Sequence, residues 1–202
     1  MKIVDLFPTA IGHFKYENGF SDEEFNFICN QKTRLNTGNT TSVNNHILED
    51  KSLKNIKDFI NACVKEYFES IYRPQYDVMP YITQSWVNYT KPNEFHHKHE
   101  HPNSFISGCI YIDADMDLDR IYFFKNKYEQ VQVQPKDFNL YNSESWWVPV
   151  NKCDVVLFPS SLTHMVQTVG QSEKREQRIS IAFNTFLTGI IGDDLSLTEL
   201  RM

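Results

Sequence analysis

The chain lacks a basic segment, a long apolar run and a closely spaced cysteine pair, and these absences exclude several classes of protein. The formal net charge is −6, and no block of Lys and Arg could neutralise the phosphates of a nucleic acid. No stretch approaches about 18 uninterrupted apolar residues, so we expect no transmembrane helix. The N-terminus lacks an apolar core and a small-residue cleavage site, so we expect no signal peptide and a cytoplasmic protein.

The four cysteines, Cys29, Cys63, Cys109 and Cys153, are far apart and form no CxxC pair. In a reducing compartment we expect them to be buried thiols. Hydrophobic residues make up 41% of the 202 residues and include 15 Phe and 10 Tyr. That content argues against disorder and is enough for one sizeable core, so we expect a single domain over residues 1–202.

The first third of the chain predicts one strand and two helices. The strand is expected within DLFPTAIGHFKY and is broken early by Pro8. A helix is expected in the run SDEEFNFICNQKTRL, where Ser21 and Glu24 match a capping box. Residues 38–50, rich in Asn, Thr and Ser, are expected to form a loop. A longer helix is expected over about 52–72, and its apolar face consists of Leu53, Ile56, Ile60, Cys63, Val64 and Ile71.

After Pro80 the pattern changes to short runs of β-branched and aromatic residues separated by turn residues. We expect about seven strands, in the runs YITQSWVNYT, FISGCIYIDA, RIYFFKN, WWVPV, DVVLFPS, HMVQTVG and RISIAFNTFL. The fold class is therefore mainly β with flanking helices (α+β). The N-terminal strand and helices, about 1–75, would lie on a double-sheet core, about 78–190. The polar stretch 127–144 is expected to be an excursion between strands, of the kind that often covers active sites.

Four of the seven histidines lie within HHKHEH, residues 96–101. Residues two apart in extended backbone point to the same side, so His99 and His101 can bind one metal ion together. His164, at the start of the run HMVQTVG, is the best candidate for a third ligand. The spacing alone leaves two interpretations open, a metal site and a metal-free surface cluster of histidines.

The run RISIAFN predicts a strand with two different faces. Ile179, Ile181 and Phe183 form a face typical of a core, whereas Arg178 and Ser180 begin the other face. A guanidinium and a hydroxyl in this arrangement can bind a carboxylate. An arginine at a sheet edge, in a surface salt bridge, explains the pattern equally well.

Two other strands carry polar groups that could reach the same ligand. Tyr111 shares a face with Ser107 and Cys109, and its hydroxyl could meet the ligand that Arg178 holds. A tyrosine that simply fills the core is the alternative. Asn88 shares a face with Gln84 and Trp86, and its amide needs a partner if it is buried. A solvated outer face is the alternative there.

Taken in order, the segments LFPTAIG, SWVN, HEHPNSFISGCIYI, VVLFPSSLTHMV and RISIAFN resemble the 2-oxoglutarate- and Fe(II)-dependent oxygenases, in a subfamily seen in marine bacteria and their phages. The resemblance covers nearly the whole chain and is strongest over about 84–184. It implies a double-stranded β-helix, a cupin-like jelly roll, with iron at one end of the barrel. If the chain is encoded by a phage, the host cytoplasm is its expected location.

The resemblance also implies roles for individual residues. His99 matches the first ligand of the family's HxD/E…H motif and His164 matches the distal histidine. Arg178, in an RxS element with Ser180, matches the residue that binds the far carboxylate of 2-oxoglutarate. Tyr111 falls where related hydroxylases place a tyrosine on that carboxylate. His101 stands where the common motif has Asp or Glu, so it is either a third ligand or a support for the ligands, and Glu100 would point the other way.

The implied activity is hydroxylation of a C–H bond with release of succinate and CO2, and the implied cofactors are Fe(II) and 2-oxoglutarate. The substrate would be a small molecule or a protein side chain, and neither a nucleic acid nor a membrane is expected as a partner. Imidazole ligands also suit Zn, Cu and Ni. Two other classes remain open: a metal-binding cupin without catalytic activity, and a structural protein such as a virion component. The sequence leaves the oligomeric state open.

Overall fold

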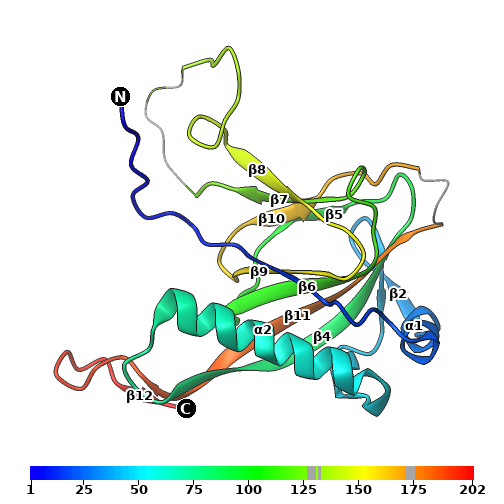
Figure 1. Ribbon diagram of the computed structural model, residues 1–202, viewed down its shortest axis with the longest axis horizontal. Coiled ribbons are helices and arrows are strands. Elements are labelled where there is room, and N and C mark those ends of the chain that lie inside the picture. The colour runs from blue at the N-terminus through cyan, green and yellow to red at the C-terminus, as the bar shows by residue number, and fades with distance from the viewer. Residues whose placement is uncertain (127–130, 132, 172–175) are drawn as a thin grey trace.

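The computed structural model describes residues 1–126, 131, 133–171 and 176–202, which form two β-sheets and two α-helices (Figure 1). The major sheet runs in the order β1 (Gly12–Lys15), β9 (Asp154–Pro159), β6 (Ile106–Asp113), β11 (Arg178–Ile191), β4 (Val78–Thr90), β3 (Thr40–Ser42) and β2 (Thr33–Leu35), and β12 (Leu200–Arg201) also pairs with β11. The small sheet runs in the order β5 (His96–His99), β10 (His164–Val166), β7 (Arg120–Phe124) and β8 (Ser145–Pro149). All of these strand pairs are antiparallel.

Both α-helices begin close to where the sequence predicts, and α2 also ends there. Helix α1 spans Asp22–Cys29, and its capping box is confirmed. The Glu24 N–H donates to the Ser21 hydroxyl at 3.2 Å, and the Ser21 N–H donates to the Glu24 carboxylate at 2.8 Å. Helix α2 spans Lys54–Tyr72 and follows two short 3₁₀ helices, η1 (Ile47–Glu49) and η2 (Lys51–Leu53).

The major sheet is covered on both faces, so the fold has three layers. One face packs on α2 through a core that includes Ile56, Ile60 and Ile181. The other face packs on the small sheet through a second core that includes Phe158 and Phe123. Alternation along each strand sends neighbouring residues into different cores. The result is the expected double-sheet jelly roll with its helices outside the barrel (Figure 1).

The predicted first strand is present as β1 and begins at Gly12, beyond Pro8, which has no N–H for a sheet, and Phe7, whose φ is positive at 56°. Three other predictions for the first part of the chain are wrong in detail. Helix α1 ends at Cys29, and Thr33–Leu35, in the predicted helical run, form β2. Within the expected loop 38–50, Thr40–Ser42 form β3, since β-branched threonines suit a strand, and β3 lies between β4 and β2. Ile71 is 48% exposed and does not join the apolar face of α2, because it lies in the last turn of the helix.

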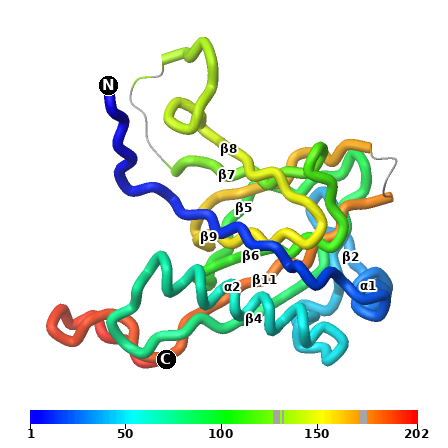
Figure 2. Tube along the Cα trace, viewed as in Figure 1, coloured from blue at the N-terminus to red at the C-terminus, as the bar shows by residue number. Residues whose placement is uncertain are grey.

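Strands β5 and β12 were not among the predicted runs. The N-terminal segment runs past β9 towards the segment that precedes β8 (Figure 2), and the Tyr141 hydroxyl donates to Asp5 at 3.0 Å. Tyr141 belongs to the expected excursion 127–144, of which residues 127–130 and 132 lie outside the described residues. The four cysteines are free thiols, two buried and two half-buried. Within the described ranges, no helix is long and apolar enough to cross a membrane.

Candidate metal centre and carboxylate pocket

Three histidines from two neighbouring strands meet at one end of the barrel. His99 ends β5 and His164 begins β10, and the two residues are directly opposite in the register of these strands. His101 lies two residues beyond β5, where its backbone N–H donates to the Ser160 carbonyl at 3.0 Å. One ring nitrogen from each of His99, His101 and His164 lies within 4.8 Å of the other two. We call these three residues the triad.

Hydrogen bonds to backbone carbonyls orient two of the three rings. His99 Nδ1 lies 2.7 Å from the His97 carbonyl, and His164 Nδ1 lies 2.9 Å from the Leu162 carbonyl. Because a carbonyl only accepts, both Nδ1 atoms carry the proton and both Nε2 atoms keep a free lone pair. A carbonyl that fixes the tautomer in this way is typical of histidines that bind metals.

The nitrogens of His101 and His164 are spaced like two ligands of one ion. His101 Nε2 lies 3.2 Å from His164 Nε2. Two nitrogens about 2.0–2.1 Å from a common ion at tetrahedral or octahedral angles lie roughly 3.0–3.4 Å apart. Since His164 Nε2 accepts, His101 Nε2 donates this hydrogen bond. A cation would replace the shared proton, which then moves to His101 Nδ1.

Burial keeps the triad neutral and therefore ready to bind a cation. Desolvation and the neighbouring histidines lower the pKa of His164 to about 3 and that of His101 to about 4. The pKa of His99 is also lowered, mainly by burial. Glu100 does not supply a carboxylate here, because its side chain is exposed and accepts a hydrogen bond from the Thr163 hydroxyl. The interpretation of a solvated surface cluster does not fit His164, which is 6% exposed.

A row of polar side chains crosses three adjacent strands of the major sheet beside the triad. Ser180 on β11 is paired with Asn88 on β4 and with Tyr111 on β6. Arg178 lies two residues from Ser180 on the same face of β11. The opposite face of β11, with Ile179, Ile181 and Phe183, is in the core below α2, as the alternation predicts.

Several polar atoms of this row are buried and have no hydrogen-bond partner within the part of the chain that the structure describes. Arg178 is only 4% exposed, which excludes a surface salt bridge. Among the described residues, its Nε and Nη1 atoms, the Tyr111 hydroxyl and the Asn88 amide oxygen have no hydrogen-bond partner. The Arg178 guanidinium lies 5.1 Å from the centre of the Tyr111 ring. Burial raises the pKa of Tyr111, so its hydroxyl stays a donor. A buried cation with free donors is costly unless an anion satisfies it.

The triad and three members of the polar row, Asn88, Arg178 and Ser180, line one cavity of about 30 Å³. That volume holds only one or two water molecules, so a dicarboxylic acid enters only if lining side chains shift. Trp86, Thr90 and Cys109 also line the cavity, and burial raises the pKa of the Cys109 thiol to about 11. Tyr111 is fully buried and belongs to the second core, so it fills the core as well as facing this row.

His96 and Thr90 line the cavity, and neither was given a role from the sequence. Thr90 is paired with Arg178 across β4 and β11. The spacing of Asn88 and Thr90, two residues apart on one strand, is the signal that could have identified Thr90. His96 carried no comparable signal, because its orientation depends on an irregularity in the pairing of β5.

Comparison with known proteins agrees with this geometry. The sequence model of a family described as "Putative 2OG-Fe(II) oxygenase" matches residues 84–184, which is half of the chain. That segment holds the triad and the whole polar row. No curated protein matches the chain.

Solved structures with the same fold have low sequence identity. An oxidoreductase of the 2OG-Fe(II) oxygenase family from Burkholderia pseudomallei is 11% identical, with a TM-score of 0.57 over 87% of this chain and 83% of that one. HygX from Streptomyces hygroscopicus, with nickel, 2-oxoglutarate and hygromycin B bound, is 9% identical, with a TM-score of 0.57 over 88% and 82%.

A third structure is a prolyl hydroxylase from Trichoplax adhaerens in complex with a peptide fragment of hypoxia inducible factor. It is 13% identical, with a TM-score of 0.50 over 76% of this chain and 66% of that chain. These likenesses show the jelly-roll fold, and the sequence model adds the family. The chain belongs to the 2OG-Fe(II) oxygenase family.

Proposed function

We propose that this protein is a dioxygenase that hydroxylates a C–H bond, using Fe(II) and 2-oxoglutarate. In the balanced reaction, substrate, O2 and 2-oxoglutarate give hydroxylated substrate, succinate and CO2. The observation that carries the proposal is the shared cavity, in which three neutral imidazoles lie beside a buried arginine whose Nε and Nη1 have no partner among the described residues. The cation site and the carboxylate site that the cofactors need are therefore neighbours.

The triad would hold the metal ion. His99 and His164 each present Nε2, and His101 Nε2 lies 3.2 Å from His164 Nε2. Three ligands on one side of an octahedral ion leave positions for a chelating 2-oxo acid and for oxygen. When bound, Fe(II) supplies the activation of oxygen that the side chains cannot provide. Three imidazoles give a site with one negative charge fewer than the HxD/E…H motif, which weakens its preference for Fe(II) over softer cations.

The polar row would hold the far carboxylate of 2-oxoglutarate. Arg178 has buried donors, Nε and Nη1, without a partner among the described residues, and a guanidinium can bind a carboxylate through its N–H groups. Ser180 lies two residues along the same face, and Tyr111 and Asn88 flank it. The raised pKa of Tyr111 keeps its proton available for donation. These groups would position the cosubstrate without taking part in bond breaking.

The substrate would be a small molecule or a protein side chain. One similar structure contains hygromycin B and another contains a peptide fragment. Both classes of substrate are therefore compatible with the family. We expect the protein to act in the cytoplasm, and in the host cytoplasm if it is encoded by a phage.

The test is turnover of 2-oxoglutarate by tag-free protein loaded anaerobically with Fe(II) and then exposed to oxygen. We expect succinate to form, slowly without substrate and faster when a substrate is found. His164→Ala, matched with the exposed His46→Ala as a control, should abolish the succinate. A metal-binding cupin without catalytic activity would bind the metal and form no succinate, and a structural protein would bind no metal.

A further inference from the structure

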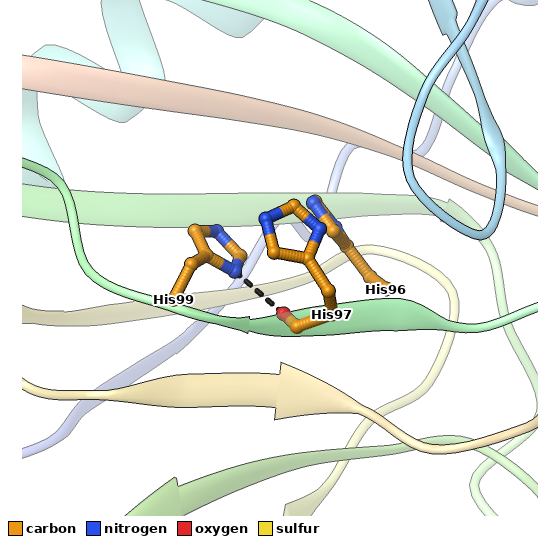
Figure 3. A group of neighbouring side chains, drawn as sticks. All are labelled: His96, His97 and His99. Carbon is orange, nitrogen blue, oxygen red and sulfur yellow. Dashed lines mark hydrogen bonds between the residues drawn. The ribbon is translucent and has the colours of Figure 1, made fainter.

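The strand β5 contains a bulge that places two additional histidines, His96 and His97, on the same side as His99. On β10, His164 and Val166 are two residues apart, whereas their partners on β5, His99 and His96, are three apart. One residue of β5 is therefore extra, and this is the irregularity that defines a β-bulge. Figure 3 shows the rings of His96, His97 and His99 on the same side of the strand. Lys98 is exposed, with its ammonium 4.0 Å from the centre of the Phe124 ring.

His96, His97 and His99 together have the geometry of a cation site. One ring nitrogen from each lies within 4.8 Å of the other two. Their ring centres lie 5.2 Å (His96 to His97), 4.6 Å (His96 to His99) and 4.7 Å (His97 to His99) apart. His97 Nδ1 is buried and has no hydrogen-bond partner among the described residues. A buried ring nitrogen without a partner is costly, and a cation would satisfy it.

We propose that His96, His97 and His99 form a second cation site, the bulge site, which competes with the triad for His99. His99 Nδ1 is occupied by its hydrogen bond to the His97 carbonyl at 2.7 Å. Only Nε2 of His99 is free, so one cation at a time can use this ring. A cation in the bulge site therefore removes one ligand from the triad.

The donor set indicates which cations the bulge site binds. It consists of three imidazoles and no carboxylate, a set that suits Zn²⁺, Ni²⁺ and Cu²⁺ better than Mg²⁺ or Ca²⁺. His96 also lines the cavity beside Arg178. The bulge site is thus a place where a late transition-metal ion would displace iron from the triad and occupy space near the cosubstrate.

The experiment measures Zn²⁺ binding by tag-free protein in which the two ligands unique to the triad are removed. We expect the His101→Ala/His164→Ala variant to bind one Zn²⁺ per chain in calorimetry or equilibrium dialysis. Adding His96→Ala and His97→Ala to this double variant, which gives a variant lacking four histidines, should weaken Zn²⁺ binding at least tenfold. Adding His99→Ala alone to the double variant should weaken it as much. Adding His46→Ala, which removes an exposed histidine far along the chain, should leave it unchanged.

A His101→Ala/His164→Ala variant that binds Zn²⁺ no better than the variant lacking all four histidines would overturn the proposal. So would two Zn²⁺ ions bound tightly and independently by the unmodified protein, because the two sites share His99. If the double variant does not fold by circular dichroism, the single variant His101→Ala carries the same comparison. None of these measurements involves 2-oxoglutarate, so they fail or succeed separately from the proposed oxygenase function.

Discussion

Replacing Arg178 by methionine should separate cosubstrate binding from stability. The guanidinium is 4% exposed, and its Nε and Nη1 atoms lack partners within the described part of the chain. Two hydrogen bonds to a carboxylate contribute about 1.5–3 kcal/mol each. Allowing for incomplete additivity, their loss costs about 3–5 kcal/mol, which corresponds to roughly 10²–10⁴-fold weaker binding of 2-oxoglutarate.

The same substitution should leave the metal-free protein as stable as before, or make it more stable. Methionine has a similar length and removes a buried charge, two of whose donors have no partner among the described residues. Replacing buried ionic groups by apolar ones is often neutral or stabilising by about 1–4 kcal/mol. If Arg178 instead supported the fold, its replacement would leave a cavity and lower the free energy of unfolding. The measured stability therefore distinguishes an arginine that binds a ligand from one that stabilises the fold.

The assay is anaerobic calorimetric titration of the Fe(II)-loaded variant with 2-oxoglutarate, together with thermal unfolding of the metal-free variant. Arg178→Lys is the matched control, since it keeps the charge and loses the paired donors, and it should give an intermediate affinity. A methionine variant that binds 2-oxoglutarate within tenfold of the unmodified protein would refute the role of Arg178.

Three further predictions follow from the geometry. His101→Ala should abolish tight binding of Fe(II) by the triad, whereas His101→Asp restores the HxD/E…H motif and should keep Fe(II) bound. Metal analysis of the folded protein checks both variants. An Asp variant that holds no Fe(II) would show that His101 is not a ligand. Because burial lowers the pKa of His101 to about 4 and of His164 to about 3, both stay neutral when folded but are protonated below about pH 6.5 when unfolded. The free energy of unfolding of the metal-free protein should therefore fall as the pH drops from about 6.5 towards 4, and a flat Tm over this range would contradict the assignment. Gly108→Ala should destabilise the fold by about 1–3 kcal/mol in urea unfolding, because the Cβ of the new alanine would lie 2.5 Å from a Leu157 methyl carbon and 2.6 Å from Phe183. Gly170→Ala is the control and should have little effect, since the nearest contact of its Cβ is at 3.6 Å.

Much of the fold could be predicted because its patterns are local. Alternation placed Ile179 and Ile181 in the core and Arg178 and Ser180 on the opposite face of β11. The capping box at Ser21 also depends only on neighbouring residues, and it is confirmed.

Features that depend on strand pairing could not be predicted from the sequence. Strand β5 consists of histidines and a lysine, which carry little β-propensity, and it forms because β10 pairs with it. The bulge that turns His96 and His97 to one side exists only in that pairing. The burial of Arg178 likewise depends on which segments cover the cavity, and spacing along the chain says nothing about that.

The most direct test of the central claim is an anomalous-scattering map at the iron edge, from crystals loaded anaerobically with Fe(II) and 2-oxoglutarate. The proposed function predicts one iron peak about 2.0–2.3 Å from a ring nitrogen of each of His99, His101 and His164. It also predicts the far carboxylate of 2-oxoglutarate on Arg178. Iron bound elsewhere, or 2-oxoglutarate bound without contact to Arg178, would contradict it.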